Sequence, residues 1–147
     1  MNEYLDASVI VKWFRKDERH HKASIRILDD IRTLEKNYIT SKLTLLELTR
    51  ALVKVEASRD KIDSSFEFVD ELFRMGALGY IPIDEVIYLS RELEIDLNLY
   101  ASDAIHVASA IQSQCKVLWS EDDHHTKKKT KDYLKRYDIE VRTLNDI

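Results

Sequence analysis

Only two glycines and one proline occur among the 147 residues, and this scarcity restricts the folds open to the chain. Glycine and proline build the tight turns that many short strands require, so a turn-rich all-β fold is excluded, as is a glycine-rich phosphate loop. No repeat, low-complexity linker or change of composition divides the sequence. We therefore expect one helix-rich domain, long enough to bury roughly two-thirds of its unfolded surface.

Hydrophobic spacing predicts that strands alternate with helices. Short apolar runs predict strands at 2–6, 37–41, 78–83, 116–120 and 140–144. Helical spacing predicts helices at 8–14, 20–36, 42–57, 60–75, 84–93 and 102–114, the last with Ser102 as its N-cap, and 122–137 as a polar helix or a loop plus helix. Strands separated by helices are typical of a parallel sheet covered on both faces. The expected fold class is α/β.

Four acidic residues lie at or near the points where predicted strands give way to helices. Asp6 ends the first strand, Asp103 opens a helix, Asp122 follows the strand at 116–120, and Glu47 lies in the helix after the second strand. Functional groups in open parallel sheets collect beyond the carboxyl ends of the strands, so these side chains are expected to converge. Each has a simpler interpretation: Asp6 and Asp122 as N-caps, Asp103 as a partner of the helix dipole, and Glu47 as a surface partner of Arg50.

Converging carboxylates repel one another unless a cation lies among them. Mg²⁺ prefers oxygen ligands, and four acids suit one or two such ions. Two ions roughly 3.5–4 Å apart can activate water on one side of a phosphodiester and stabilise the leaving oxygen on the other. The acids therefore favour metal-dependent phosphodiester hydrolysis. No serine or cysteine stands beside a histidine in a recognisable nucleophile pattern, so no covalent intermediate is expected.

The charge and cysteine content narrow the setting and the partners. A net charge of −4 gives no long-range attraction for nucleic acid, so RNA binding would need a local basic patch. The run "HHTKKKTKDYLKR" offers Lys127, Lys128, Lys129 and Lys131 as RNA contacts, and fits a solvated helix equally well. The single cysteine allows no intramolecular disulfide, and no apolar run approaches the ~20 residues that span a bilayer. We expect a cytoplasmic protein without membrane attachment.

Four segments carry a resemblance to a known family. They are "YLDASVIVKWF", "SKLTLLELTRALVK", "YASDAIHVASAIQ" and "VLWSEDD". In this order and spacing they resemble PIN-domain ribonucleases, especially the VapC-type toxins of VapBC toxin–antitoxin pairs, over nearly the whole chain. The resemblance implies a single PIN domain at 1–147: a three-layer α/β/α sandwich with a central parallel sheet of four or five strands.

The resemblance also implies roles for individual residues. It assigns catalysis and metal binding to four acids, which are Asp6, Glu47, Asp103 and Asp122, and supporting hydroxyls to Ser8 and Ser120. The last motif departs from the family's more usual single acid, because it reads "EDDHH". Asp123 or Glu121 is therefore an alternative to Asp122, or shares its role. Among the histidines, His106 is expected to form a local hydrogen bond rather than bind metal, and His124 and His125 are at most substrate contacts.

The activity implied is that of an endoribonuclease dependent on Mg²⁺ or Mn²⁺, which uses metal-activated water and leaves a 5′-phosphate and a 3′-hydroxyl. The implied partners are an RNA substrate, a VapB-type antitoxin and a second copy in a homodimer. Two alternatives keep the fold: a housekeeping RNA-processing nuclease without an antitoxin, and a non-catalytic module that binds RNA or protein. A phosphatase of the haloacid-dehalogenase type is disfavoured, because it needs a second acid where Ser8 stands.

Overall fold

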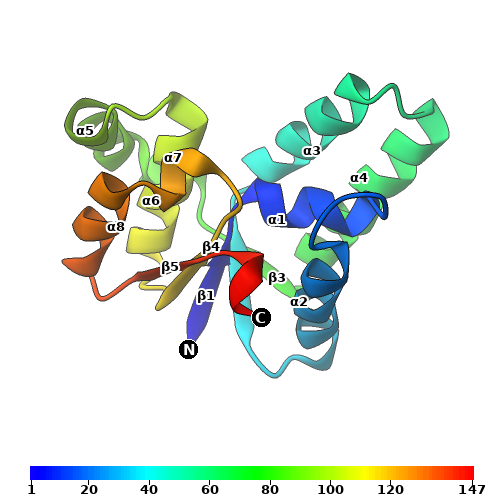
Figure 1. The fold of residues 1–147 in the computed structure, drawn as a ribbon, viewed down its shortest axis with the longest axis horizontal. Helices are drawn as coiled ribbons and strands as arrows, with labels where there is room; N and C mark the ends of the chain where they lie inside the picture. The colour runs from blue at the N-terminus through cyan, green and yellow to red at the C-terminus, as the bar shows by residue number, and fades with distance from the viewer.

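The computed structural model describes residues 1–147 as a parallel sheet between two layers of helices (Figure 1). The strands are β1 (Asn2–Leu5), β2 (Asn37–Thr40), β3 (Leu78–Tyr80), β4 (Val117–Trp119) and β5 (Glu140–Arg142). The helices are α1 (Ala7–Val11), α2 (His21–Thr33), α3 (Leu43–Lys54), α4 (Arg59–Arg74), α5 (Ile87–Leu97), α6 (Ala101–Gln112), α7 (Asp123–Thr126) and α8 (Lys128–Lys135). The expected α/β/α sandwich with a parallel sheet is confirmed, with five strands.

The strand order β3-β2-β1-β4-β5 places the N-terminal strand at the centre of the sheet. From β1 the chain proceeds outward through β2 to β3, and α1 to α4 cover one face on the way (Figure 1). It then returns to β4 on the other side of β1, and α5 to α8 cover the opposite face. The direction of winding therefore reverses between β1 and β4. Ligands of open α/β sheets bind at such a reversal, beyond the carboxyl ends of the strands.

Alternating side chains on the central strands supply two separate cores. Leu5 of β1 and Trp119 of β4 face the layer of α1 to α4, where they join a cluster of 18 buried residues. Tyr4 and Leu118, their neighbours in sequence, face the layer of α5 to α8 within a cluster of 13. Because both faces of the sheet are covered, β4 is a continuous apolar run of three buried residues rather than an alternating pattern.

Several predicted boundaries were wrong for local reasons. The strand expected at 78–83 ends at Tyr80, because Pro82, which lacks an N–H, leads into a 3₁₀ helix, η2 (Ile83–Glu85), and the helix after it begins only at Ile87. Ser102 is not an N-cap: α6 already begins at Ala101, preceded by Tyr100 in an extended conformation. The polar segment forms two helices, α7 and α8, and the C-terminal strand ends at Arg142.

Gly76 follows α4 with φ of 74°, but with so little glycine the other helix ends that turn into the left-handed region use other residues. Leu34 ends α2 with φ of 57°, and Asn98 ends α5 with φ of 53°. Asn accepts this conformation more readily than most side chains, whereas leucine is strained by roughly 1–2 kcal/mol. No helix combines the length and the apolar character needed to cross a membrane.

The central position of β4 allows a direct test of the core. Leu118 is fully buried between α6, α8 and the sheet, whereas Leu46 on α3 is 63% exposed. We expect Leu118→Ala to lower the free energy of unfolding by roughly 2–5 kcal/mol, because it leaves a cavity in a packed interior. The same substitution at Leu46 should change it by less than about 0.5 kcal/mol. Urea denaturation followed by circular dichroism measures both values, and equal losses would contradict this packing.

Candidate metal centre

The site lies at the reversal of winding, where β1 and β4 both end. The backbone N–H of Asp6 donates to the carbonyl of Trp119 at 3.0 Å, which joins the two strand ends. Asp6 is also the N-cap of α1 and accepts from the backbone N–H of Ser8 at 3.1 Å. Asp122 is likewise the N-cap of α7 and accepts from the N–H of His124 at 2.8 Å. Both aspartates are therefore N-caps, and their capping positions bring them to the same place.

Two serines connect the Asp6 carboxylate to the loop after β4. The Ser8 hydroxyl donates to Asp6 Oδ2 at 2.6 Å and accepts from the backbone N–H of Glu121 at 2.9 Å. The Ser120 hydroxyl lies 3.3 Å from the same oxygen and accepts from the N–H of Asp122 at 3.0 Å. Each hydroxyl thus fixes both the carboxylate and the backbone that carries Asp122.

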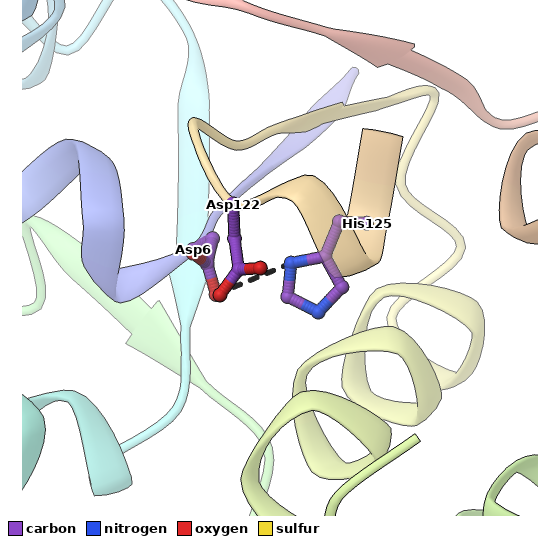
Figure 2. Close-up of side chains that lie close together, drawn as sticks. All are labelled: Asp6, Asp122 and His125. Atoms are coloured by element: carbon purple, nitrogen blue, oxygen red, sulfur yellow. Dashed lines mark ion pairs between the residues drawn. The ribbon is translucent and has the colours of Figure 1, made fainter. Parts of the chain in front are cut away.

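Asp6, Asp122 and His125 form a group whose potential metal-ligand atoms all lie within 4.8 Å of one another. Figure 2 shows the two carboxylates and the imidazole ring facing one another. His125 is fully buried, with Nδ1 3.6 Å from Asp6 Oδ1 and Nε2 3.3 Å from the carbonyl oxygen of Asp103. Because a carbonyl oxygen only accepts, Nε2 carries a hydrogen. Nδ1, which faces Asp6 and lies 3.1 Å from the Ser120 hydroxyl, is therefore the ring nitrogen that could turn its lone pair to a metal.

This group of ligand atoms fits a divalent cation. Two carboxylates supply the hard oxygen ligands that Mg²⁺ and Mn²⁺ prefer, and an imidazole nitrogen suits Mn²⁺ better than Mg²⁺. Asp6 is only 3% exposed, so its charge needs compensation inside the protein or from an ion. The groove in front of Asp6 and Asp122 leaves space for water and substrate oxygens to complete the coordination.

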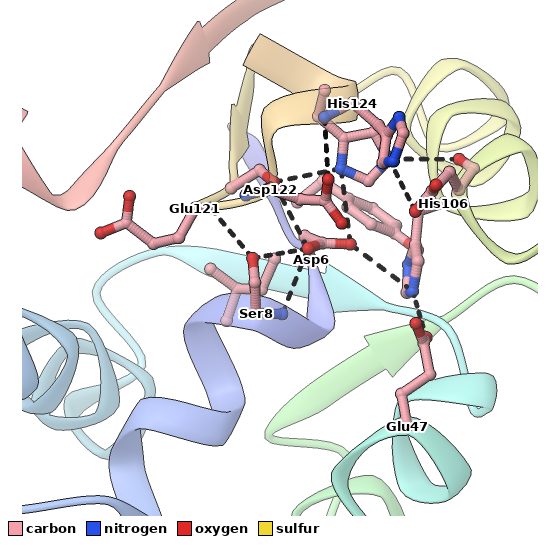
Figure 3. Close-up of polar contacts among 12 residues, drawn as sticks. Asp6, Ser8, Glu47, His106, Glu121, Asp122 and His124 are labelled. Carbon is pink, nitrogen blue, oxygen red and sulfur yellow. Dashed lines mark hydrogen bonds and ion pairs between the residues drawn. The ribbon is translucent and has the colours of Figure 1, made fainter. Parts of the chain in front are cut away.

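His106 connects Glu47 to the group (Figure 3). Its Nε2 lies 2.5 Å from Glu47 Oε1 and 3.6 Å from Asp6 Oδ1, and its Nδ1 lies 2.8 Å from the Tyr4 hydroxyl. The carboxylate of Glu47 only accepts, so Nε2 carries a hydrogen. The expected local hydrogen bond of His106 is therefore confirmed. The interpretation of Glu47 as a partner of Arg50 is wrong, because the structure pairs Glu47 with His106.

The pKa shifts follow from these contacts. Burial alone would raise the pKa of Asp6, but the charges of His106 and His125 and the hydrogen bonds of Ser8 outweigh it and hold that pKa below its usual range. Burial would lower the pKa of His106, but Asp6 and Glu47 outweigh it and raise that pKa. Burial raises the pKa of Asp103, with Asp122 and Asp6 adding to the effect and His125 opposing it. In the absence of metal, the Asp6 carboxylate is therefore held ionised.

The predicted acids are not equally close to this group. Asp103 Oδ1 lies 3.8 Å from His125 Nε2, and Glu47 reaches Asp6 only through His106. Of the three acids considered for the last position, Asp122 belongs to the group, and Figure 3 shows the Glu121 carboxylate pointing away from it. Asp123, the first residue of α7, is also outside the group.

His125 is the residue that sequence reasoning misjudged. Its interpretation as a substrate contact is wrong, because the ring is fully buried between Ser120 and Asp103. One signal was present in the sequence: His125 follows the N-cap Asp122 by three residues, and side chains three apart in the first turn of a helix are neighbours.

A groove of about 400 Å³ opens beside the group and is lined on one wall by α3. Its charged lining residues are Asp6, Asp122, Glu47, Arg50 and Lys54. The lysines of α8 do not line this groove. Lys128 is paired with Asp132 at 2.9 Å, whereas Lys129 and Lys131 line two other hollows.

A PIN domain family model matches residues 4–131, and the chain therefore belongs to the PIN domain family. No curated protein matches the sequence.

Two solved structures share the fold. VapBC2 from Rickettsia felis, bound to a DNA fragment from its promoter, gives a TM-score of 0.60 at 16% identity, covering 97% of this chain and 98% of that chain. FitAB bound to the IR36 DNA fragment gives 0.63 at 16% identity, covering 97% of this chain and 94% of that chain. At this level of identity the likeness concerns the fold.

The raised pKa of His106 predicts a pH-dependent contribution to stability without metal. Because the folded-state pKa lies above the unfolded value of about 6.5, the stabilisation is complete below that pH and is lost as pH rises through the folded pKa. The difference in free energy of unfolding between wild type and His106→Gln, measured by urea denaturation in EDTA, should be larger near pH 6 than near pH 9. A difference that does not change with pH would contradict a charged His106.

Proposed function

We propose that this PIN domain is a metal-dependent endoribonuclease. The observation that carries the proposal is the convergence of Asp6, Asp122 and His125 at the reversal between β1 and β4, with Asp103 and Glu47 at its margin. PIN domains are generally metal-dependent nucleases, which supports the same reaction. RNA as the substrate rests on the sequence resemblance to PIN-domain ribonucleases.

Asp6, Asp122 and Nδ1 of His125 would hold one Mg²⁺ or Mn²⁺ ion, with Asp103 and Glu47 completing the acidic quartet. When bound, a divalent ion activates water and neutralises charge on the phosphodiester. Ser8 and Ser120 fix the Asp6 carboxylate through Oδ2, which leaves Oδ1 on the side of the His125 ring as the oxygen that would serve as ligand. His106 orients Glu47 through Nε2, and the Tyr4 hydroxyl fixes the ring at Nδ1. Cleavage would leave a 5′-phosphate and a 3′-hydroxyl.

We further propose that the protein is the toxin of a toxin–antitoxin pair, with a VapB-type antitoxin and a second copy of the chain as partners. The resemblance to VapC-type toxins supports this assignment, as does the shared fold with VapBC2 and FitAB, each bound to DNA in its structure. Co-expression with the product of a neighbouring small gene tests it. Loss of cleavage in a stable complex would support the proposal, whereas unchanged cleavage would favour a housekeeping nuclease.

Asp6→Asn should abolish cleavage of a mixed structured-RNA pool in Mg²⁺ or Mn²⁺, while the protein remains folded. Wild type should lose activity in EDTA. Because ionised Asp6 compensates His106, the variant in EDTA should also melt at a lower temperature than wild type. Mn²⁺ should raise the melting temperature of wild type but not that of Asp6→Asn, since an ion bound only to the folded state stabilises it.

Asp29→Asn is the matched control for this experiment. Asp29 is exposed on α2 and forms no ion pair, so the substitution removes one carboxylate outside the site. Its cleavage rate and its Mn²⁺-dependent melting shift should match those of wild type. Wild-type protein that is folded and free of a copurified inhibitor, yet cuts no RNA in either metal, would favour a non-catalytic binding module.

Substitution at the three neighbouring acids distinguishes their roles. Asp122→Asn should weaken Mn²⁺ binding by more than the roughly 10–100-fold that loss of an outer hydrogen-bond partner produces, because it removes a direct ligand. Asp123→Asn and Glu121→Gln should change the affinity far less, since their carboxylates lie outside the group. Calorimetric titration with Mn²⁺ gives the affinities. A larger loss in either of the last two variants would reassign the ligand.

A further inference from the structure

Arg50 and Lys54 line the same groove as the acidic group, on the wall formed by α3. With Glu47 they follow at intervals of three and four residues, so the three side chains share one face of the helix. At about 1.5 Å of rise per residue, Lys54 lies roughly 10 Å along the axis from Glu47. Along this face of α3, Arg50 and then Lys54 therefore lie at increasing distance from Glu47.

Both cations are free of protein partners. Arg50 and Lys54 are exposed and form neither an ion pair nor a side-chain hydrogen bond, although Glu47 lies one turn from Arg50. Glu47 is engaged by His106 instead, which leaves the guanidinium unpaired. Unpaired cations on a groove wall have their donors available to an anion that enters the groove.

The other basic candidates are engaged or placed elsewhere. Lys12 is paired with Glu18 at 3.1 Å, and Arg15 is paired with both Asp17 and Glu18. Lys128 is paired with Asp132. None of these side chains lines the groove, nor do Lys129 and Lys131.

The net charge of −4 makes such contacts necessary for a polyanion. A nucleic-acid strand that reaches the acids meets unfavourable charge from the whole molecule, so cations must lie within the groove itself. Ala51, between Arg50 and Lys54 on the same wall, has a small side chain that leaves room for a backbone to approach.

We infer that Arg50 and Lys54 bind phosphates of a single-stranded RNA that flank the cleaved bond, and so position the substrate along α3. The inference rests on the proposed nuclease function and names the path of its substrate. Lysine and arginine contacts to phosphate fix position and carry no base specificity. Arg50 and Lys54 are thus positioning residues for any sequence.

The test measures binding separately from cleavage. A random-sequence single-stranded RNA pool is titrated in Mg²⁺ with protein carrying Asp6→Asn, which prevents cleavage, and fluorescence anisotropy gives Kd across a range of salt concentrations. Adding Arg50→Gln and Lys54→Gln should raise Kd about tenfold. The slope of log Kd against log salt should fall by about 0.7 for each lost contact, hence by about 1.4.

A matched control carries Lys22→Gln and Arg26→Gln. These exposed residues are also one lysine and one arginine four positions apart, but they lie on α2 and outside the groove. The control therefore removes the same total charge, and its Kd and salt slope should stay within twofold of the Asp6→Asn parent. Equal losses in the two double variants would overturn the inference, because the effect would then come from net charge alone.

The cleavage assay separates this inference from the proposed function. In the otherwise wild-type protein, Arg50→Gln with Lys54→Gln should raise KM and leave kcat and Mn²⁺ affinity unchanged. Unchanged KM and unchanged Kd would overturn the role of Arg50 and Lys54 while leaving the nuclease intact, and would favour a protein partner for this wall. Absence of cleavage in wild type, with RNA binding still lost in the double variant, would overturn the nuclease and support the phosphate contacts.

Discussion

The buried charge of Asp6 depends on contacts from four separate parts of the chain. Ser8 belongs to α1, Ser120 follows β4, His106 lies on α6 and His125 lies on α7. A carboxylate almost without solvent exposure would destabilise the fold by several kcal/mol if these partners were absent. The contacts that make its burial tolerable are also those that align the ends of β1 and β4. Folding and the assembly of this candidate metal site are therefore the same event.

Helix α3 combines two tasks on one face. Glu47 turns inward and is held by His106, whereas Arg50 and Lys54 stay free along the groove. This difference depends on the partner of Glu47. If Glu47 were paired with Arg50, its carboxylate would leave the buried network around Asp6, and the groove would lose an unpaired cation. A single buried histidine thus determines how charge is distributed over the whole wall.

The sequence predicted most of the fold, because apolar strands between amphipathic helices allow few arrangements other than a covered parallel sheet. The strand-end rule likewise located Asp6 and Asp122, which both cap helices there. The role of His125 was missed because its burial depends on packing between α6 and α7, which no local pattern encodes. The lysine run was a second difficulty: consecutive residues of a helix point about 100° apart, so neighbours in sequence do not share a surface.

The two oxygens of the Asp6 carboxylate have different surroundings. Oδ2 accepts from the backbone and hydroxyl of Ser8 and lies beside the hydroxyl of Ser120, whereas Oδ1 faces the rings of His106 and His125. A carboxylate anchored through one oxygen presents only the other and cannot swing to offer both. Calcium commonly takes bidentate carboxylates in shells of six to eight oxygens, whereas magnesium needs single oxygens in a tight octahedron. The serine contacts therefore leave Asp6 with one oxygen to offer a cation, an arrangement that suits the octahedral shell of magnesium better than the larger shell of calcium.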